Sequence, residues 1–190
     1  MNLKGSETEK NLLAAFAGES QARNRYTYFA SVAKKDGYEQ ISAIFLETAE
    51  NEKEHAKRFF NFLEGGMAEY TATFPAGRIG TTIENLEAAA EGEHEEWTKL
   101  YPAFANIARQ EGYGEIANAF NYITQVEIKH ERRYLKLLEN LRLAAVFKKE
   151  KIVIWKCRNC GYHHEGLAVP ELCPACLHPK NYFEILAENY

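Results

Sequence analysis

Glutamate and histidine residues recur in this 190-residue chain in two copies of one pattern. Each copy has a lone glutamate, followed 33 or 34 residues later by Glu-x-x-His. Residues i and i+3 share a helix face, so each Glu-x-x-His can offer an oxygen and a nitrogen to one ion. Carboxylates and imidazoles suit iron or manganese. The six residues are Glu19, Glu52 and His55 in the first copy and Glu93, Glu127 and His130 in the second.

Glu96 and two tyrosines extend this pattern. Glu96 lies three residues after Glu93 and shares its helix face, whereas the first copy has Ala22 at that position. The predicted site is therefore asymmetric, with five glutamates and two histidines. Tyr26 and Tyr101 follow the lone glutamates by two helical turns, and we expect them either to pack in the core or to hydrogen-bond a carboxylate and supply protons. A single Glu-x-x-His usually lies on a solvated helix face, so the duplication is what favours metal.

All four cysteines lie near the C-terminus in two C-x-x-C pairs, with 12 residues between the pairs. Two such pairs predict tetrahedral binding of one ion. Zinc and iron both accept four thiolates, so the spacing does not choose between them. Since no cysteine is left over and the chain starts without an apolar export signal, we expect a reducing cytoplasm. The four are Cys157, Cys160, Cys173 and Cys176.

Four helices are predicted to position the glutamates and histidines, because apolar residues recur at spacings of three and four between glycine-containing turns. The predicted boundaries are a capping box at Ser6 and Glu9, a break at Gly37, an end of the second helix at Gly65–Gly66, a cap at Thr81 or Thr82, an end of the third helix at about Gln110, a turn at 112–114, and an end of the fourth helix at about Val146.

The two predicted hairpins look like repeats, because residues 33–38 align with 108–113 at an offset of 75. A repeated hairpin joined by one long crossover, here 67–80, is the ferritin-like topology, whereas up-and-down bundles use short loops throughout. We therefore expect a mainly α protein. It has a ferritin-like four-helix bundle over 1–147 and a small metal-binding knuckle domain with short β-strands over 148–190.

One extra residue interrupts the match between the repeats. Glu19 and Glu93 are offset by 74 residues, but Tyr26 and Tyr101, with everything after them, are offset by 75. The third helix therefore holds one more residue between Glu93 and Tyr101. We predict that a π-bulge accommodates it, since such bulges occur mostly at functional sites.

Taken together, these motifs resemble the rubrerythrin family over nearly the whole chain. The similarity lies in residues 17–26 and in Glu52-Lys53-Glu54-His55-Ala56, and it continues through 92–96 and 127–131. In the tail it runs from Cys157 to Cys176 and on to Pro179-Lys180. The resemblance implies a rubredoxin-type iron on the four cysteines and a non-haem di-iron site with His55 as a switching ligand. The other di-iron ligands that it implies are Glu19, Glu52, Glu93, Glu96, Glu127 and His130.

The resemblance also implies an activity, which is the reduction of hydrogen peroxide to water. Electrons would come from NADH through a separate reductase, in a homodimer whose tail from one subunit lies near the di-iron site of the other. We expect Glu96 to leave the site on reduction and His55 to replace it, because five carboxylates over-supply the reduced site with negative charge. A ferroxidase that handles iron and a dioxygen-reducing oxidase are the alternatives, and the cysteine-rich tail has no evident use in the former.

Other features bear on partners and on redox potential. A formal net charge of −4 without a long basic block argues against nucleic acid as a partner. No apolar run is long enough to cross a membrane. Leu177 follows the fourth cysteine, where rubredoxins usually carry glycine, and we expect it to crowd an amide that would hydrogen-bond sulfur. The redox potential would change, whereas the ligation would not.

Overall fold

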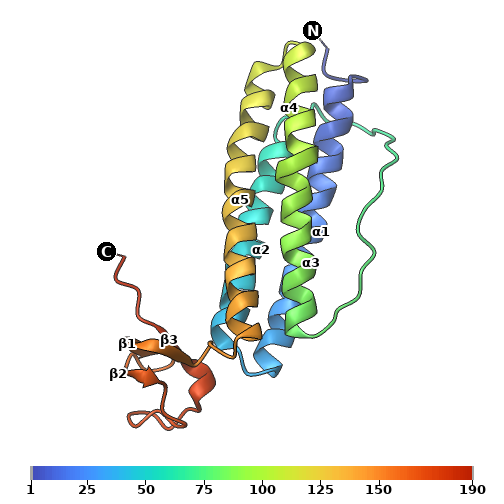
Figure 1. Cartoon of the computed structure of the whole chain (residues 1–190). Helices are drawn as coiled ribbons and strands as arrows, with labels where there is room; N and C mark the ends of the chain where they lie inside the picture. The colour runs from blue at the N-terminus through green and yellow to red at the C-terminus, as the bar shows by residue number, and fades with distance from the viewer. Residues whose placement is uncertain (1, 190) are drawn as a thin grey trace.

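The computed structural model describes residues 2–189 as a long helical bundle with a small β domain at one end (Figure 1). The π-helical turn η1 joins α3 to α4, so these three form one continuous helix and the bundle has four helices. This confirms the predicted four-helix bundle, and η1 confirms the predicted π-bulge. The bounds are α1 Glu7–Lys35, α2 Glu39–Phe60, α3 Thr82–Glu95, η1 Glu96–Leu100, α4 Tyr101–Gln110 and α5 Gly114–Arg142.

The two hairpin turns have the same backbone geometry, as the repeat predicts. Gly37 and Gly112 have φ angles of 86° and 85°, a left-handed conformation that glycine adopts without steric cost. In each turn the amide of the next residue, Tyr38 or Tyr113, donates to the carbonyl five residues back, at 2.8 and 2.7 Å. Both helices of each hairpin are therefore brought antiparallel by the same device.

Each hairpin turn also caps the first helix of the other hairpin. The Asp36 carboxylate accepts from the amide and hydroxyl of Thr82, at 3.2 and 2.6 Å. In the same way Glu111 accepts from the amide and hydroxyl of Thr8, at 2.8 and 2.5 Å. A negative charge at a helix N-terminus satisfies free amides and interacts favourably with the helix dipole. These reciprocal caps fix the relative height of the hairpins and of the residues they carry.

The predicted caps at the starts of the helices are met in part. Thr81 accepts from the amide of Glu84, whose carboxylate accepts from the amide of Thr81, so this capping box is complete. Ser6 accepts from the amide of Glu9 at 3.0 Å, but the Glu9 carboxylate accepts from Gly5 at 2.7 Å. The predicted box at Ser6 is therefore wrong in its second half, because the Ser6 amide is already bonded to the Leu3 carbonyl.

Two helices end earlier than their sequences predict. The second helix, α2, ends at Phe60, and the chain turns before it reaches Gly65 and Gly66, which have φ angles of 76° and 90°. The last helix, α5, ends at Arg142 rather than near residue 146. There Ala144 takes a left-handed φ of 50°, and the following amide bonds a carbonyl five residues back. This conformation closes a helix without glycine.

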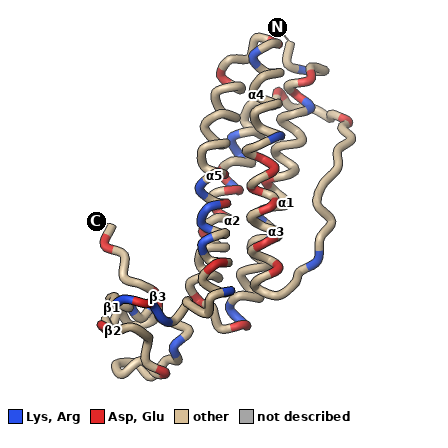
Figure 2. Tube along the Cα trace, in the orientation of Figure 1, with Lys and Arg blue, Asp and Glu red and all other residues tan. Residues whose placement is uncertain are grey.

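The crossover over 61–81 has no regular structure and runs as an extended strap along the outside of the bundle (Figure 1). It links the end of α2 to the start of α3, as the ferritin-like topology requires. In Figure 2 acidic residues recur along the middle of α1 and α3, between the two ends of the bundle. No helix within residues 2–189 has the length and apolar character that crossing a membrane requires.

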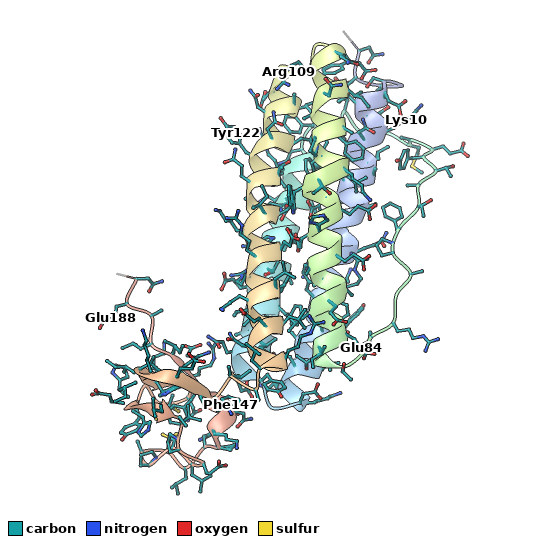
Figure 3. All side chains as sticks on the ribbon, in the orientation of Figure 1. Lys10, Glu84, Arg109, Tyr122, Phe147 and Glu188 are labelled. Carbon is teal, nitrogen blue, oxygen red and sulfur yellow. The ribbon has the colours of Figure 1, made fainter. Side chains whose placement is uncertain are left out.

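The tail is a three-stranded antiparallel sheet with strand order β2-β1-β3, built around buried Trp155 and Phe183. It lies at the end of the bundle that holds the α1–α2 turn, where η2 and β3 contact α2 (Figure 1). The Phe147 ring, labelled in Figure 3, stacks on Tyr38 with ring centroids 6.1 Å apart. The bounds are β1 Lys148–Cys157, β2 His163–Ala168, η2 Lys180–Tyr182 and β3 Phe183–Ile185.

Candidate metal centres

The four helices bring the six repeated glutamates and histidines together in the middle of the bundle. They form two overlapping groups of four residues, and in each group the possible ligand atoms all lie within 4.8 Å of one another. Glu52 and Glu127 belong to both groups. The first group adds Glu19 and His55, and the second adds Glu93 and His130.

Glu52 and Glu127 each direct one oxygen toward each histidine. His55 Nδ1 lies 2.9 Å from Glu52 Oε2 and 2.9 Å from Glu127 Oε1. His130 Nδ1 lies 3.1 Å from Glu52 Oε1 and 2.8 Å from Glu127 Oε2. The two rings lie 6.0 Å apart, nearly parallel. Glu52 and Glu127 would therefore each be able to offer one oxygen to each of two neighbouring ions.

The burial of these side chains tests whether they fit two cations. All four glutamates of the two groups are at most 1% exposed. Among the described residues, eight of the group's oxygen and nitrogen atoms are buried and have no hydrogen-bond partner outside the group. Uncompensated buried carboxylates are strongly unfavourable. Two divalent cations would supply the missing partners, so the donor set fits a di-metal site.

The pKa values describe the same excess of negative charge. Burial, and then the neighbouring carboxylates, raise the pKa values of Glu19 and Glu93 well above their usual range. Burial by itself would lower the pKa of His55, but the carboxylates of Glu127 and Glu52 raise it to about 9. Against the same burial, Glu127, Glu52 and Glu93 raise the pKa of His130 to about 12. Without metal, protons on these groups offset the carboxylate charges, and metal binding must displace them.

Glu96 differs from the other predicted ligands, because it belongs to neither group. It is the first residue of η1 and lines a cavity of about 310 Å³ beside the site. His55 lies among the carboxylates instead, 3.8 Å from Glu19 through Nδ1. The exchange of Glu96 for His55 on reduction stays a prediction. Ligation by Glu96 stays a prediction.

Tyr26 and Tyr101 both pack in the core and hydrogen-bond a carboxylate. Both rings are buried among other aromatic side chains. The Tyr26 hydroxyl donates to Glu93 at 2.5 Å, and the Tyr101 hydroxyl donates to Glu19. Burial, and then the adjacent carboxylate, raise the pKa of each phenol well above its usual range. Each phenol therefore stays protonated while it donates a hydrogen bond to its carboxylate.

Two polar side chains near the site, Asn51 and Trp97, have no motif that marks them in the sequence. Asn51 Oδ1 lies 3.3 Å from His130 Nε2, the ring nitrogen opposite the one that faces the carboxylates. Trp97 Nε1 donates to Glu131 at 2.6 Å, and His94 Nδ1 lies 2.8 Å from the other oxygen of Glu131. The Glu131 side chain is only 14% exposed and binds both of these neighbours. His94 belongs to neither of the two ligand groups.

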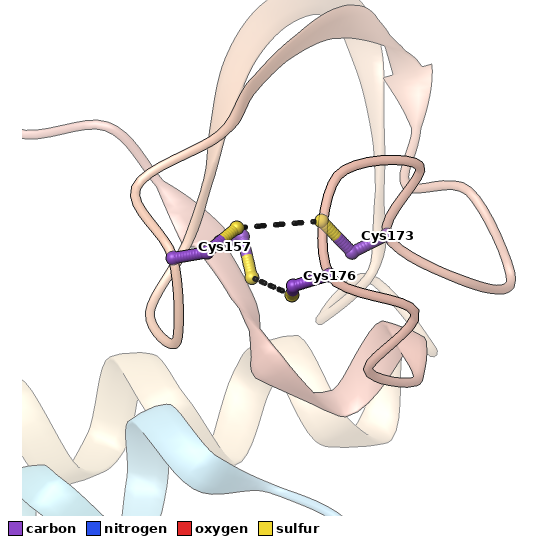
Figure 4. A group of neighbouring side chains, drawn as sticks. Cys157, Cys173 and Cys176 are labelled. Atoms are coloured by element: carbon purple, nitrogen blue, oxygen red, sulfur yellow. Dashed lines mark hydrogen bonds between the residues drawn. The ribbon is translucent and has the colours of Figure 1, made fainter.

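The four cysteine sulfurs also gather within 4.8 Å of one another. The Sγ atoms of Cys157 and Cys176 lie 3.8 Å apart, and those of Cys160 and Cys173 lie 3.6 Å apart, as the dashed lines in Figure 4 mark. Disulfide sulfurs lie at about 2.05 Å. A tetrahedron with metal–sulfur bonds of about 2.3 Å has edges of about 3.8 Å, so these thiols fit one ion.

Leu177 does not crowd the thiolate site. Its side chain is 72% exposed, and its amide donates to the Cys173 carbonyl at 2.8 Å, as Gly161 does to Cys157. The expectation that Leu177 blocks an amide needed by sulfur is therefore wrong. His178 supplies that amide, and this hydrogen bond is the main cause that lowers the pKa of the Cys176 thiol to about 6. The effect of leucine in place of glycine lies in the backbone instead, because Leu177 has a left-handed φ of 60°.

Known proteins match the chain over its whole length. A rubrerythrin from Porphyromonas gingivalis is 64% identical over all of this chain and 94% of its own. A rubrerythrin from Nitratidesulfovibrio vulgaris is 60% identical over all of this chain and 99% of its own. A solved structure of nigerythrin in a partially reduced state superposes with a TM-score of 0.64 at 32% identity, and covers 96% of this chain and 90% of that one.

More distant structures and family models agree. A bacterioferritin from Desulfovibrio desulfuricans, with a TM-score of 0.64 at 21% identity over 73% of this chain and 82% of that one, shares the ferritin-like fold. The rubrerythrin family model matches residues 10–138, and that of the rubrerythrin rubredoxin-like domain matches 155–184. The chain therefore belongs to the rubrerythrin family of di-iron proteins, with a glutamate and histidine cluster for two irons and four cysteines for one more.

Proposed function

We propose that this protein is a non-haem di-iron peroxidase that reduces hydrogen peroxide to water with electrons received through its four-cysteine iron. The observation that carries the proposal is the pair of ligand groups bridged by Glu52 and Glu127, on a chain that also holds a four-thiolate site. Reduction of one peroxide takes two electrons and two protons and releases two waters. Two iron ions, held by the two ligand groups, would supply these two electrons.

The protein's own residues give peroxide a route and a polar end point. The cavity of about 310 Å³ lies between α1, η1 and the strap, and its lining includes Glu96 and Tyr101. Most of the remaining lining is apolar, through residues such as Leu100, Phe104 and Phe74. An apolar channel that ends at a few polar groups is typical of small-molecule sites. We propose that peroxide enters here and that Tyr101 holds Glu19 in place while the O–O bond breaks.

Electron delivery favours a homodimer. Within one chain the tail packs against the α1–α2 turn. A Cβ atom added at Gly37 in this turn would lie 3.8 Å from Asn181 of the tail. Glu52 lies 15 residues further along α2, which is about 22 Å at 1.5 Å per residue. We propose that the partner subunit's tail lies closer to this di-iron site, and that a separate NADH-dependent reductase reduces the tail. Four unlinked thiols with this geometry suit the reducing cytoplasm.

Anaerobic rapid mixing tests the proposal. The iron-loaded, fully reduced protein is mixed with hydrogen peroxide and, separately, with dioxygen, while visible absorbance follows oxidation of the four-cysteine iron. If this absorbance rises fast with peroxide and slowly with dioxygen, the result supports a peroxidase that receives its electrons through the four-cysteine iron of the tail. The reverse order would support a dioxygen-reducing oxidase or a ferroxidase, and no rise with either would overturn electron transfer through the tail.

A matched pair of variants separates the two metal sites in this experiment. C173S removes one thiolate, so the visible signal is lost, while peroxide is still consumed in one turnover of the di-iron site. E52A removes a carboxylate common to both ligand groups, so peroxide consumption is lost while the tail keeps its iron. If E52A consumed peroxide at the wild-type rate, the reaction would lie elsewhere on the chain.

A further inference from the structure

The Glu96 carboxylate lies in the cavity beside the di-iron site, next to helix α1. One face of α1 forms the floor of this cavity, and η1 and the strap complete the wall. At Gly18 an added Cβ would lie 4.0 Å from Glu96 Oε1, so a longer side chain at this position would meet the carboxylate. The absence of a side chain at Gly18 therefore leaves room for Glu96 outside both ligand groups.

Arg25 supplies a positive charge to the same cavity. It lies seven residues after Gly18, two turns along the same face of α1, and both line the cavity with Glu96. Its Nη1 atom is buried without a hydrogen-bond partner. No carboxylate in residues 2–189 lies within ion-pair distance of its guanidinium, although Glu91 and Glu95 line the adjoining cavity with it.

The charge of Arg25 acts on Glu96 against several opposing effects. Burial raises the pKa of Glu96, and the carboxylates of Glu93, Glu127 and Glu52 raise it further. The Arg25 guanidinium acts in the other direction and favours the charged carboxylate. Because Glu96 and the unpartnered, buried Nη1 atom of Arg25 share one cavity, a Glu96 carboxylate that leaves the metal site moves into a space that holds a positive charge.

We infer that Arg25 is a positioning residue, which stabilises Glu96 in this cavity and so favours the arrangement in which His55, and not Glu96, is among the metal ligands. The inference deepens the proposed function and rests on it, because a site that changes redox state has use for two positions of Glu96. Gly18 contributes as well, because its lack of a side chain leaves space for the Glu96 carboxylate, and Arg25 supplies the positive charge that attracts it.

Crystal structures of the reduced, iron-loaded protein test the inference directly. In wild type, Glu96 lies in the cavity. In R25Q the ratio of withdrawn to metal-directed Glu96 falls about tenfold, a change of about 1.4 kcal/mol, because the withdrawn carboxylate loses a nearby positive charge. R25K restores much of the ratio. R23Q is the control, since Arg23 lies on the same helix but faces Glu50. An unchanged ratio in R25Q, or an equal change in R23Q, would overturn the inference.

Other measurements keep the test decisive if R25Q is poorly folded. G18V adds a side chain next to the withdrawn carboxylate and should also return Glu96 to the metal site, so a withdrawn Glu96 in G18V would overturn the inference. The di-iron midpoint potential is also compared for R25Q in the wild-type and E96A backgrounds. A shift that disappears in E96A shows action through Glu96, whereas an equal shift in both shows a direct effect on the iron charge.

None of these measurements uses peroxide. If the reduced protein fails to react with peroxide, the proposed function fails while the position of Glu96 can still be read. If peroxide reacts but the R25Q variant holds Glu96 in the cavity as wild type does, only the role of Arg25 fails.

Discussion

Tyr26 of α1 donates a 2.5 Å hydrogen bond to Glu93 of α3, across the interface between the two hairpins. Tyr101 of α4 donates in the opposite direction to Glu19 of α1. Each hairpin thus provides the donor for the other hairpin's lone glutamate, and each phenol leaves the second carboxylate oxygen free to face the metal site. The repeat in the sequence therefore becomes a pair of reciprocal contacts in the structure.

Removing one phenol should affect the reaction more than the fold. We expect Y101F to slow peroxide reduction about 10²-fold, because positioned acids and hydrogen-bond donors contribute at least that much. The buried Glu19 oxygen also loses its partner, which costs about 1–3 kcal/mol in the free energy of unfolding. Rapid mixing and iron content measure the first effect and thermal unfolding the second. Y122F is the control, since Tyr122 is 69% exposed. Wild-type kinetics in Y101F would contradict a role for the phenol.

The shared carboxylates predict distinct metal stoichiometries. Glu52 belongs to both ligand groups and Glu19 to one. E52A should therefore lose both bundle irons, while E19A should lose the iron of the His55 group first. Metal analysis and protein concentration give the total number of irons per chain. The tail iron is quantified by its visible absorbance and subtracted from this total. E54A, which alters an exposed residue paired with Lys57, should keep all three irons. Equal losses in E52A and E19A would refute the bridging arrangement.

The left-handed backbone at Leu177 predicts a stabilising substitution. A non-glycine residue at a φ of 60° costs about 1 kcal/mol relative to glycine. L177G should therefore raise the free energy of unfolding of the tail by about that amount, since the exposed leucine side chain loses little packing. Denaturant unfolding followed by the loss of the tail iron's visible absorbance measures it. L167G, at an exposed strand position, should destabilise instead. A loss of stability in L177G would show that Leu177 has contacts that offset its backbone cost.

The Glu111 cap predicts a pH-dependent contribution to stability. The Thr8 hydroxyl is the main cause that holds the pKa of Glu111 below its usual range. A carboxylate with a lowered folded pKa stabilises fully above its unfolded pKa of about 4.3, and this contribution is lost as the pH falls through the folded pKa. E111A should therefore cost about 0.5–2 kcal/mol near pH 7, the range for lost helix caps, and much less near pH 3.

Urea unfolding of wild type and E111A at several pH values checks this sign. E115A is the matched control on the neighbouring helix, since Glu115 is exposed and pairs only with Arg58 among the described contacts. Its effect should stay within about 0.5 kcal/mol, as for other surface ion pairs. A cost in E111A that grows as the pH falls would mean that Glu111 does not act as a charged cap.

Much of this protein can be read from its sequence, because its repeat puts the same residue types at the same positions of each helix pair. The Glu-x-x-His spacing, the glycine turns and the long crossover predict the bundle. The one-residue difference in offset between Glu93 and Tyr101 predicts the π-helical turn, because a helix that must keep both residues facing the core can absorb an extra residue only as a bulge. The two C-x-x-C pairs predict the second centre.

Only the tertiary structure decides where each side chain turns within its helix face. Glu93 and Glu96 share a face in a regular helix, yet η1 begins at Glu96 and directs it into a cavity with Arg25. The caps of Thr8 by Glu111 and of Thr82 by Asp36 join residues that are far apart in the chain, so no local pattern marks them. Spacing along one helix fixes which residues can face the core, whereas the packing of the other helices, with the space and charge they leave, decides which of them meet.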